Sequence, residues 1–257
     1  MMNMLEYECV CNNKICYFKK IKPCINKKRI LSIIIPTYNE EKNISRLINS
    51  LAKNIIGLNY EIVVVDDDSK DNTPNIINKL AMSNRILALH RRGVKGIFSA
   101  IQDGIKLSNS QIIIIMDSDF SHPPKIINDL LKYIKNYDIV SASRFISRGG
   151  IEAPILRKYG TTILNKIVRF ILDLKITDYT GGFHAIKKSK FNQLKFKYKS
   201  IWGEFDMELL YLARKNNFKI KEIPFTYKFR DEGHSKSENL LKYGLVYLTR
   251  AIQLRLS

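Results

Sequence analysis

The chain has 257 residues and a formal net charge of +19, because it contains 43 lysines and arginines but only 24 acidic residues. A chain of this length can bury a core large enough to fold without disulfides or structural metals. Charged residues interrupt every apolar segment before it reaches the roughly 20 residues of a spanning helix, which excludes an integral membrane protein. The positive charge indicates an anionic partner, which could be nucleic acid, a membrane surface or a phosphorylated substrate.

The first 29 residues mix Cys, Asn and Lys without a periodic pattern, and we expect them to form an N-terminal extension at 1–29. All four cysteines lie in it, at Cys9, Cys11, Cys16 and Cys24. Their spacing matches no paired zinc motif, so free thiols are favoured over a metal site. The N-terminus also lacks the continuous apolar core of a secretory signal, which favours the cytosol.

Short apolar strands and amphipathic helices alternate from residue 29 onward. The predicted strands cover residues 31–35, 61–65, 86–89, 112–116 and 139–142. Helices are expected after the first four strands, with their last apolar positions at Leu51, Leu80, Ile105 and Ile134. This order predicts βαβ units and an α/β fold whose mostly parallel, Rossmann-like sheet carries helices on both faces. No G-x-G-x-x-G follows the first strand, so we expect no nicotinamide or flavin site of that type.

The second half of the chain predicts two basic amphipathic helices. Residues 155–175 carry apolar side chains on one side and basic ones on the rest, which fits either a core-packing or an interfacial helix. A glycine turn at 178–183, a helix at 204–213, short strands at 220–224 and 225–229 and a charged loop at 230–237 follow. The last helix is expected at 240–256. We place the main domain at 30–237 and a C-terminal amphipathic helix at 238–257.

Two carboxylates, Asp117 and Asp119, directly follow the apolar strand at 112–116. In open parallel sheets, ligands bind at the carboxyl ends of the strands. In an extended D-x-D both side chains point to the same side, so they can share a hard divalent cation or hold it together with a phosphate. A plain surface turn is the alternative, and the buried strand before the pair favours the metal.

Polar residues also follow the first two strands. The ring of Tyr38 can stack on a base, Glu40 can accept hydrogen bonds from a base or ribose, and Asp67 can accept one from a base N–H. The alternative for Asn39 or Asp67, taken singly, is that the residue only caps a turn. Three polar clusters at the ends of the first, second and fourth predicted strands are harder to explain in that way, because parallel strands bring those ends together.

Six segments together resemble the motifs of polyprenyl-phosphate sugar transferases of the dolichyl-phosphate mannosyltransferase type, which belong to glycosyltransferase family 2 and have the GT-A fold. These segments are PTYNE at 36–40, DDDS at 66–69, DSDFSHPP at 117–124, SASR at 141–144, DYTGGF at 178–183 and RDEGHSK at 230–236. Ser121, His184 and Phe98 depart from residues common in such enzymes, which bears on substrate contacts rather than on the reaction class.

The resemblance assigns residues to three groups. The nucleoside of a sugar nucleotide would be held by Pro36, Tyr38, Glu40, Val65 and Asp67. Its diphosphate would be held through Mg2+ or Mn2+ by Asp117, Ser118 and Asp119, with the two aspartates as the metal ligands. The phosphates of donor or acceptor would be faced by Arg144, Arg157, Arg230 and Lys236. Catalysis would rest on Asp119, Arg144 and Arg230.

The resemblance also implies a reaction: inverting transfer of mannose from GDP-mannose to dolichyl or another polyprenyl phosphate, which gives dolichyl phosphate mannose for glycan assembly. A lipid monophosphate is mostly dianionic at neutral pH and needs positioning more than a base. His122 and His184 are therefore expected to be structural. The alternative within the enzyme class is a UDP-glucose donor.

A basic protein that binds nucleic acid or a membrane surface without transferase activity is the alternative from another class. The scattered basic residues match no nucleic-acid module, so we expect no nucleic-acid partner. We expect peripheral binding to an anionic membrane surface, at the cytosolic face of the endoplasmic reticulum in a eukaryote or of the plasma membrane in a prokaryote. Small membrane-anchoring subunits are candidate partners.

Overall fold

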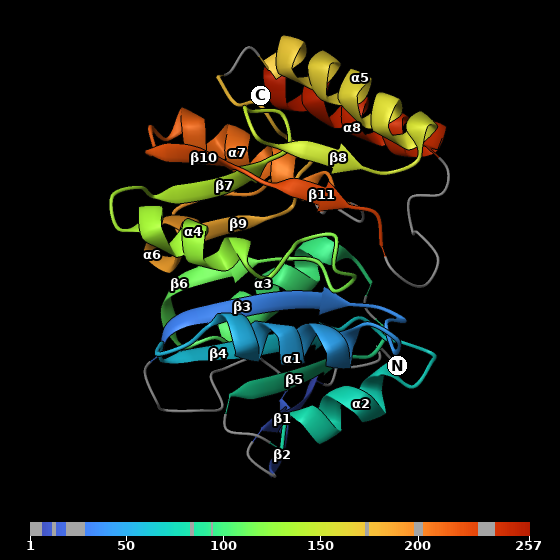
Figure 1. The fold of residues 1–257 in the computed structure, drawn as a ribbon, viewed down its shortest axis with the longest axis vertical. Coiled ribbons are helices and arrows are strands. Elements are labelled where there is room, and N and C mark those ends of the chain that lie inside the picture. The colour runs from blue at the N-terminus through green and yellow to red at the C-terminus, as the bar shows by residue number, and fades with distance from the viewer. Residues whose placement is uncertain are drawn as a thin grey trace.

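The computed structural model describes residues 7–11, 14–18, 29–82, 85–93, 95–172, 175–197, 203–230 and 240–257. A nine-stranded sheet runs through the molecule (Figure 1). In their order across the sheet, the strands are β10 (Ile220–Pro224), β7 (Ile139–Ser143), β9 (His184–Lys187), β6 (Ser110–Ile115), β3 (Arg29–Thr37), β4 (Tyr60–Asp66), β5 (Ile86–Arg91), β1 (Tyr7–Cys11) and β2 (Lys14–Phe18). A second sheet contains β8 (Gly150–Glu152) and β11 (Thr226–Lys228).

Seven of the nine strands point in one direction, and only β9 and β1 run against them. The four strands β6, β3, β4 and β5 pair in parallel, as do β10 and β7. Strand β9 is antiparallel to both β6 and β7, and β1 is antiparallel to both β5 and β2. The carboxyl ends of β3, β4, β6 and β7 therefore lie at the same edge of the sheet, where open parallel sheets bind their ligands.

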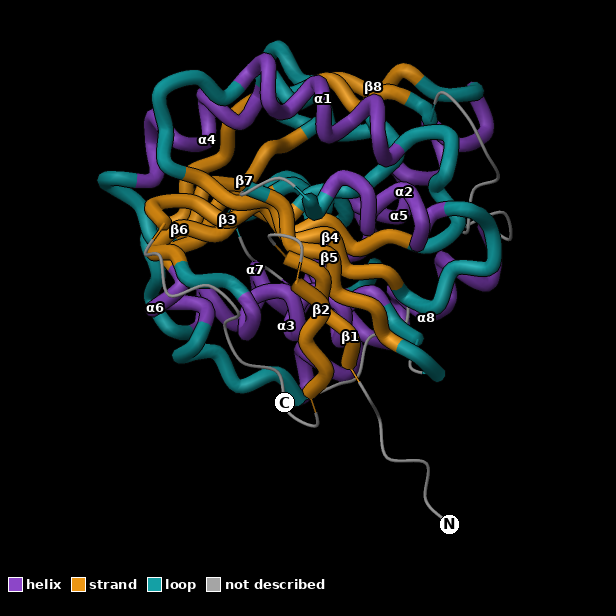
Figure 2. The backbone as a smooth tube through the Cα atoms, turned by 90° about the horizontal axis from the view of Figure 1, so that it is seen from below, coloured by secondary structure: helices purple, strands orange, loops and turns teal. Residues whose placement is uncertain are grey.

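Helices cover both faces of the sheet, as expected for βαβ units. One face carries α1 (Ile44–Asn54), α2 (Thr73–Leu80) and α4 (Ile126–Ile134). The other carries α3 (Ile97–Leu107), α5 (Ile155–Leu172), α6 (Lys188–Phe191), α7 (Phe205–Lys215) and α8 (Leu240–Leu256). Figure 2 shows α1 and α4 on one side of the strands and α3 and α7 on the other. Among the described helices, none is long and apolar enough to cross a bilayer.

The sheet has a hydrophobic core on each face, and the same strands contribute side chains to both cores. In β3, Ile34 belongs to the core on the α3 side, whereas Ile33 and Ile35 belong to the core on the α1 side. Side chains alternate along a strand, so a strand that is covered on both faces needs a continuous apolar run. Ile33–Ile35 form such a run, which helps to explain why the sequence alone indicated this strand.

Helix α3 lies unusually close to the sheet at Gly104. A Cβ added there would lie 2.7 Å from Cγ2 of Ile34 and 2.9 Å from Cγ2 of Val65. Only a glycine permits this approach without displacement of the strands. Because α3 begins directly after Gly96, the close contact also fixes the loop that precedes the helix.

The structure differs from the sequence prediction near the N-terminus of the chain. No strand was predicted before Arg29, but β1 and β2 form a hairpin whose first strand pairs with β5 at the sheet edge. Cys9 of this hairpin is buried and is not part of a disulfide, and Val10 belongs to the core on the opposite face of the sheet. The pairing depends on the exposed edge of β5, which a local pattern does not reveal. The boundaries at 1–29, 30–237 and 238–257 remain predictions.

Three further elements were not predicted: β8, β9 and α6, each of four residues or fewer. Helix α1 begins at Ile44 rather than at the acidic residues before it. Helices α5 and α8 were predicted and lie side by side at one end of the molecule, where Figure 1 draws them in yellow and red.

Candidate active site

A cavity of about 510 Å³ opens at the carboxyl ends of the parallel strands. Loops after β3, β4 and β6 form one side of it, and α5, α7 and α8 contribute to the other. Ten of the twelve residues expected at a site line this cavity: Pro36, Tyr38, Glu40, Asp67, Asp117, Ser118, Asp119, Arg144, Arg157 and Arg230. Segments far apart in sequence therefore converge on one space.

Two of the expected residues are not found there. Val65 is fully buried, and its side chain belongs to the core on the α3 side rather than to the cavity. The Val65 side chain does not line the cavity, because side chains alternate along β4 and this one faces the core. A nucleoside contact from Val65 remains a prediction. Lys236 lies outside the described residues.

The loops after β3 and β4 are joined by hydrogen bonds. The amide of Asn39 donates to Ser69 at 2.9 Å, and Oδ1 of Asn39 accepts from the amide of Lys70 at 2.8 Å. The amide of Glu40 donates to Thr73 Oγ1 at 2.9 Å. Asn39 has a positive φ of 52°, a conformation that Asn tolerates better than most residues. These contacts hold Tyr38 and Glu40 at the cavity as one rigid unit.

Asp67 is held from two sides. Its Oδ1 accepts from Arg91 Nη1 at 2.7 Å, and its Oδ2 accepts from the amide of Gly96 at 2.8 Å. Arg91 is fully buried and also pairs with Asp103 of α3 at 3.2 Å. Arg91 therefore positions Asp67 relative to the loop before α3, a role that sequence reasoning missed.

Asp117 and Asp119 differ in their surroundings. The Asp119 side chain is 9% exposed; its Oδ1 accepts from the amide of Ser121 at 3.1 Å and its Oδ2 from Arg230 Nη2 at 2.8 Å. The Asp117 side chain is 43% exposed. Phe120 follows with a φ of 64°, a conformation that is costly for a bulky residue and that turns the chain sharply after the two aspartates.

The chemistry of this pair fits a hard divalent cation. Mg2+ and Mn2+ prefer oxygen ligands, and Mg2+ is commonly held by one or two carboxylates together with substrate phosphates. Among the described residues there is no group of three or more His, Cys, Asp or Glu side chains arranged for a metal. Asp117 and Asp119 would therefore need oxygens from a bound phosphate to complete the coordination.

His122 supports Asp117 rather than acting on a substrate. The amide of Asp117 donates to Nδ1 of His122 at 2.9 Å, and Nε2 donates to the carbonyl of Gly181 at 2.8 Å. The ring also stacks on Phe183 with centroids 4.8 Å apart. Both ring nitrogens of His122 are therefore engaged within the protein, which suits a positioning group.

Arg144 is neutralised by Asp178. Two side-chain hydrogen bonds, Nε to Oδ2 at 2.8 Å and Nη2 to Oδ1 at 2.7 Å, form a bidentate pair. Burial alone would raise the pKa of Asp178, but the charge and hydrogen bonds of Arg144 outweigh it and lower that pKa. Burial alone would lower the pKa of Arg144, and Asp178 raises it above its ordinary value.

A buried residue of α5 holds the loop on which Asp178 lies. Asn165 Nδ2 donates to the carbonyl of Thr177 at 2.6 Å, and its Oδ1 accepts from the amide of Tyr179 at 3.0 Å. Glu222 of β10 accepts hydrogen bonds from the amides of Thr177 and Asp178 at 3.0 Å and 3.2 Å. Asp178 is thus fixed by α5 and the sheet together.

The other two expected arginines, Arg157 and Arg230, reach the cavity from different parts of the chain. Arg157 on α5 lies over the ring of Phe229, with its guanidinium carbon 5.1 Å from the ring centre. Arg230 lies between two carboxylates, Asp119 at 2.8 Å and Glu40 at 3.6 Å. The structure therefore brings Arg230 to the Asp119 side of the cavity.

Several residues that line the cavity were not predicted. They are Lys95, Asp206, Tyr227, Tyr243 and Tyr247. The amino group of Lys95 lies 5.3 Å from the centre of the Tyr38 ring. Asp206 lies in the first turn of α7, where an acidic residue is also common simply because it stabilises the helix. The spacing of Tyr243 and Tyr247 places both on one face of α8, which is the one local signal they offer.

The sequence is similar to those of known proteins. Residues 32–195 match the sequence model of a family described as Glycosyl transferase family 2. The chain is 36% identical over 212 residues to dolichol-phosphate mannosyltransferase of Pyrococcus furiosus, an alignment that covers 80% of this chain but only 58% of that protein. It is 28% identical over 212 residues to polyprenol monophosphomannose synthase of Mycolicibacterium smegmatis, with 79% of each chain covered.

A solved structure shares the fold. Glucosyl-3-phosphoglycerate synthase from Mycobacterium tuberculosis, in complex with Mn2+, UDP and glucosyl-3-phosphoglycerate, superposes with a TM-score of 0.65 and 18% sequence identity. The superposition covers 88% of this chain and 80% of that one. At this level of identity the similarity concerns the fold and not the substrate.

Proposed function

Because this chain belongs to glycosyl transferase family 2, we propose that it transfers mannose from GDP-mannose to dolichyl or another polyprenyl phosphate. Its mixed α/β fold is the expected GT-A fold. The observation that carries the proposal is the convergence in one cavity of aromatic and acidic residues after β3 and β4, two carboxylates after β6 and three arginines. The similarity to two enzymes named for polyprenyl or dolichol phosphate mannose synthesis supports this acceptor and sugar.

In this proposal the donor lies across the strand ends. Tyr38 would stack on the base, and Asp67, held by Arg91, would accept from a base N–H. Asp117 and Asp119 would hold Mg2+ or Mn2+, which when bound neutralises the diphosphate and stabilises it as a leaving group. Arg230 already lies beside Asp119 and would add a positive charge at the same place.

The acceptor phosphate would enter from the α5 side. Arg157 lines the cavity there and would bind the phosphate oxygens. Arg144 is paired with Asp178, so it would contribute mainly hydrogen bonds from a fixed position rather than an uncompensated charge. The phosphate would attack the anomeric carbon in line with the departing diphosphate and invert its configuration. No proton needs to leave a dianionic phosphate, so no base is required.

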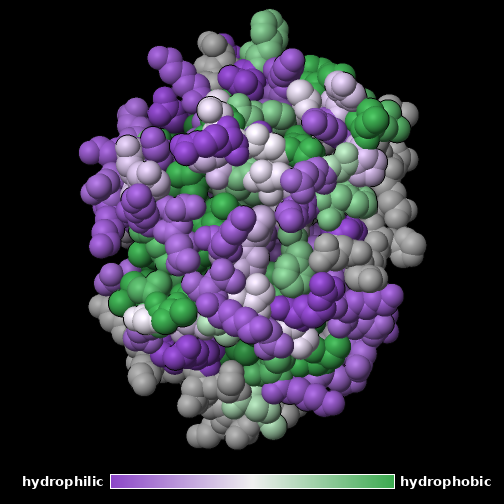
Figure 3. All heavy atoms as spheres, in the orientation of Figure 1, coloured by the Kyte–Doolittle hydropathy of each residue, from purple (hydrophilic) through white to green (hydrophobic). Residues whose placement is uncertain are grey.

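The outer surface of α5 supports a location at a membrane surface. Six large apolar side chains of this helix are exposed: Ile155, Leu156, Tyr159, Ile163, Ile167 and Phe170. Figure 3 shows green, apolar side chains along the upper edge of the molecule, where Figure 1 places α5. Lys158, Lys166 and Arg169 are exposed between them. Apolar and basic side chains on one helix suit an anionic lipid surface, and we place the protein peripherally at the cytosolic face.

A transfer assay tests the proposed function. Purified protein with Mn2+ should move radiolabelled sugar from GDP-mannose to dolichyl phosphate, and UDP-glucose and GDP-glucose serve as competing donors. Asp119→Asn should lower kcat by at least about a hundredfold while circular dichroism stays unchanged, since it removes a carboxylate beside the leaving group. Failure to transfer from any donor, or full activity of Asp119→Asn, would contradict the proposal, and a preference for UDP-glucose would correct the donor.

A further inference from the structure

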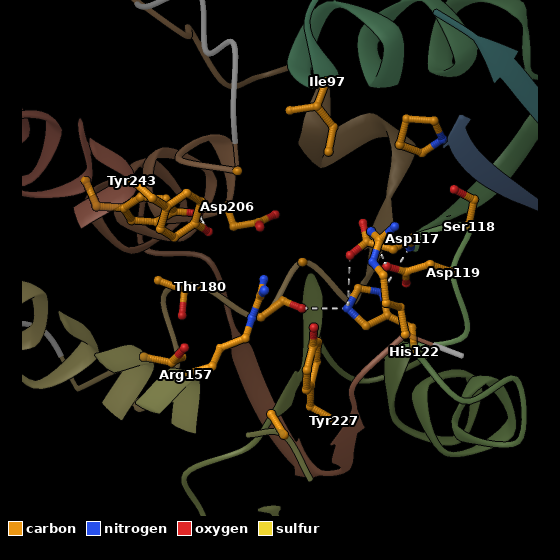
Figure 4. Close-up of a pocket in the computed structure, with 18 of the residues that line it drawn as sticks. Ile97, Asp117, Ser118, Asp119, His122, Arg157, Thr180, Asp206, Tyr227 and Tyr243 are labelled. Carbon is orange, nitrogen blue, oxygen red and sulfur yellow. Dashed lines mark hydrogen bonds and ion pairs between the residues drawn. The ribbon is translucent and has the colours of Figure 1, made fainter. Parts of the chain in front are cut away.

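One wall of the cavity carries polar groups that the proposed transfer does not use. It consists of Asp206 at the start of α7 and of Tyr243 and Tyr247 on α8, and we call it the α7–α8 wall. Figure 4 shows Asp206 and Tyr243 on the side of the cavity opposite Asp117 and Asp119. The wall therefore faces the carboxylates that would hold the diphosphate.

The side chain of Asp206 is held in place by a buried histidine. Its Oδ1 accepts from Nε2 of His184 at 3.3 Å, and Nδ1 of His184 lies 3.1 Å from the hydroxyl of Ser141 in β7. His184 is fully buried, and the Asp206 side chain is 10% exposed. Among the described residues, no donor is recorded for Oδ2 of Asp206. A carboxylate with one oxygen anchored and the other at a cavity is oriented to accept a hydrogen bond from a ligand.

The space in front of Asp206 is kept open by a glycine. A Cβ at Gly182 would lie 3.3 Å from Oδ2 of Asp206 and 3.2 Å from Cε1 of His122, and Gly182 has a positive φ of 69°. Any larger residue there would therefore enter the gap between Asp206 and the His122 that supports Asp117. The absence of a side chain leaves room for a ligand group between the two sides.

The two tyrosines add hydroxyl groups to the same wall. The hydroxyl of Tyr243 donates to that of Tyr247 at 2.9 Å, and the rings lie 4.6 Å apart. Burial raises the pKa of both hydroxyls, so both stay neutral at physiological pH. A Cβ at Gly203 would lie 2.7 Å from the Tyr247 hydroxyl, so this pair also depends on a glycine. Neutral phenols can both donate to and accept from a sugar hydroxyl.

Charge decides which part of the donor this wall can receive. A carboxylate repels phosphate but accepts hydrogen bonds from neutral hydroxyls. In a sugar nucleotide the base and ribose would lie near Tyr38 and Asp67, and the diphosphate near Asp117 and Asp119. The remaining part, the hexose, carries several hydroxyl donors. Resting on the proposed function, we infer that the α7–α8 wall is the subsite of the transferred hexose and that Asp206 accepts hydrogen bonds from its hydroxyls.

The test compares binding of the nucleotide with use of the sugar. Asp206→Asn should keep the Kd for GDP within about twofold and lower kcat/KM for GDP-mannose by about 10- to 100-fold, the value of a hydrogen bond to a charged group. Monodeoxy analogues of GDP-mannose identify the contact, because wild type and variant should use equally well the analogue that lacks the contacted hydroxyl. Asp129→Asn, which changes an exposed carboxylate of α4, is the matched control and should behave as wild type.

Three outcomes with the variant or the analogues overturn the subsite. The first is an equal loss of GDP and GDP-mannose binding in Asp206→Asn. The second is unchanged donor binding with a lower kcat and a shifted pH profile, which assigns Asp206 to proton transfer. The third is an equal penalty for every deoxy analogue. If Asp206→Asn does not fold, Tyr243→Phe removes one oxygen from the same wall and should show the same selective loss. Wild-type protein that binds GDP but shows no preference among hexoses overturns the subsite alone, whereas wild type that binds no nucleotide overturns the proposed function.

Discussion

Removing the carboxylate of Asp178 should destabilise the fold by leaving Arg144 without a counter-charge. The side chains of Asp178 and Arg144 are 0% and 6% exposed. Asp178 accepts two hydrogen bonds from the guanidinium and one from the Arg144 amide at 3.0 Å, and the Thr180 amide donates to it at 3.1 Å. Asp178→Ala therefore breaks a charge pair and orphans several buried donors.

The expected size follows from the burial of this pair. Removal of one partner of a buried ion pair costs about 3–5 kcal/mol. Arg144 borders the cavity, so water can reach part of its guanidinium, and we expect the lower end of that range, about 3 kcal/mol. For a chain of this length that corresponds to a decrease of about 6–12 °C in Tm.

Urea unfolding followed by circular dichroism measures the effect. The double variant Arg144→Met with Asp178→Leu is the control, because removal of both charges should restore most of the stability. That double variant should still be inactive if Arg144 contacts the phosphates. Restored stability without activity would separate the structural role of the pair from its catalytic one.

The pH dependence gives a second check. The pKa of Asp178 is lowered from its ordinary value of 3.8, so its stabilising contribution is fully present above that value and is lost as the pH falls through the lower, folded pKa. The difference between wild type and Asp178→Ala should thus be constant near neutral pH and shrink below pH 3.8. A loss below about 1 kcal/mol at neutral pH, as for an exposed pair, would refute the reasoning.

Three other predictions test packing, the membrane surface and the metal. Gly104→Ala should lower the free energy of unfolding by about 1–3 kcal/mol through overpacking. At Gly160 an added Cβ meets nothing within 4 Å, so Gly160→Ala should raise the free energy of unfolding by up to about 1 kcal/mol. Urea unfolding measures both, and a change of the same sign in the two variants would contradict this. Phe170 is 87% exposed and should contribute to the binding of anionic vesicles. Phe170→Ser should therefore weaken binding to such vesicles, measured by flotation, about tenfold. Wild-type protein that stays unbound at low salt would count against the membrane proposal. Chelation of divalent metal should abolish transfer but lower Tm by less than about 3 °C, because Arg230 already neutralises Asp119. A larger decrease in Tm, which corresponds to more than about 1 kcal/mol, would mean that the metal also stabilises the fold.

Local patterns were sufficient for the strand ends of the site. Asp117 and Asp119 follow a continuous apolar run, and Tyr38 and Asp67 follow two others, so each could be located from its neighbours in sequence. The parallel arrangement then required these ends to meet. The cavity contains all four residues, which confirms the expected convergence.

Partners that are distant in sequence could not be predicted in this way. Arg144 and Asp178 are 34 positions apart, and Arg230 and Asp119 are 111 apart. Such pairs depend on the tertiary fold, and an arginine or aspartate alone does not indicate its partner. The motif that contains Val65 likewise does not indicate the direction of its side chain, which in β4 faces the core rather than the cavity.

The helices that carry the exposed apolar surface also line the cavity with their inner sides. Gly160 and Leu164 of α5 and Tyr243 of α8 face the cavity, while Ile163 and Phe170 of α5 face outward. One helix, about 10–12 Å in diameter, therefore separates the outer surface from the reaction space. The polar layer of a bilayer leaflet is about 5–8 Å thick. Under the proposed function, a lipid phosphate would need to rise by about one helix diameter, roughly one and a half to two headgroup layers, to react.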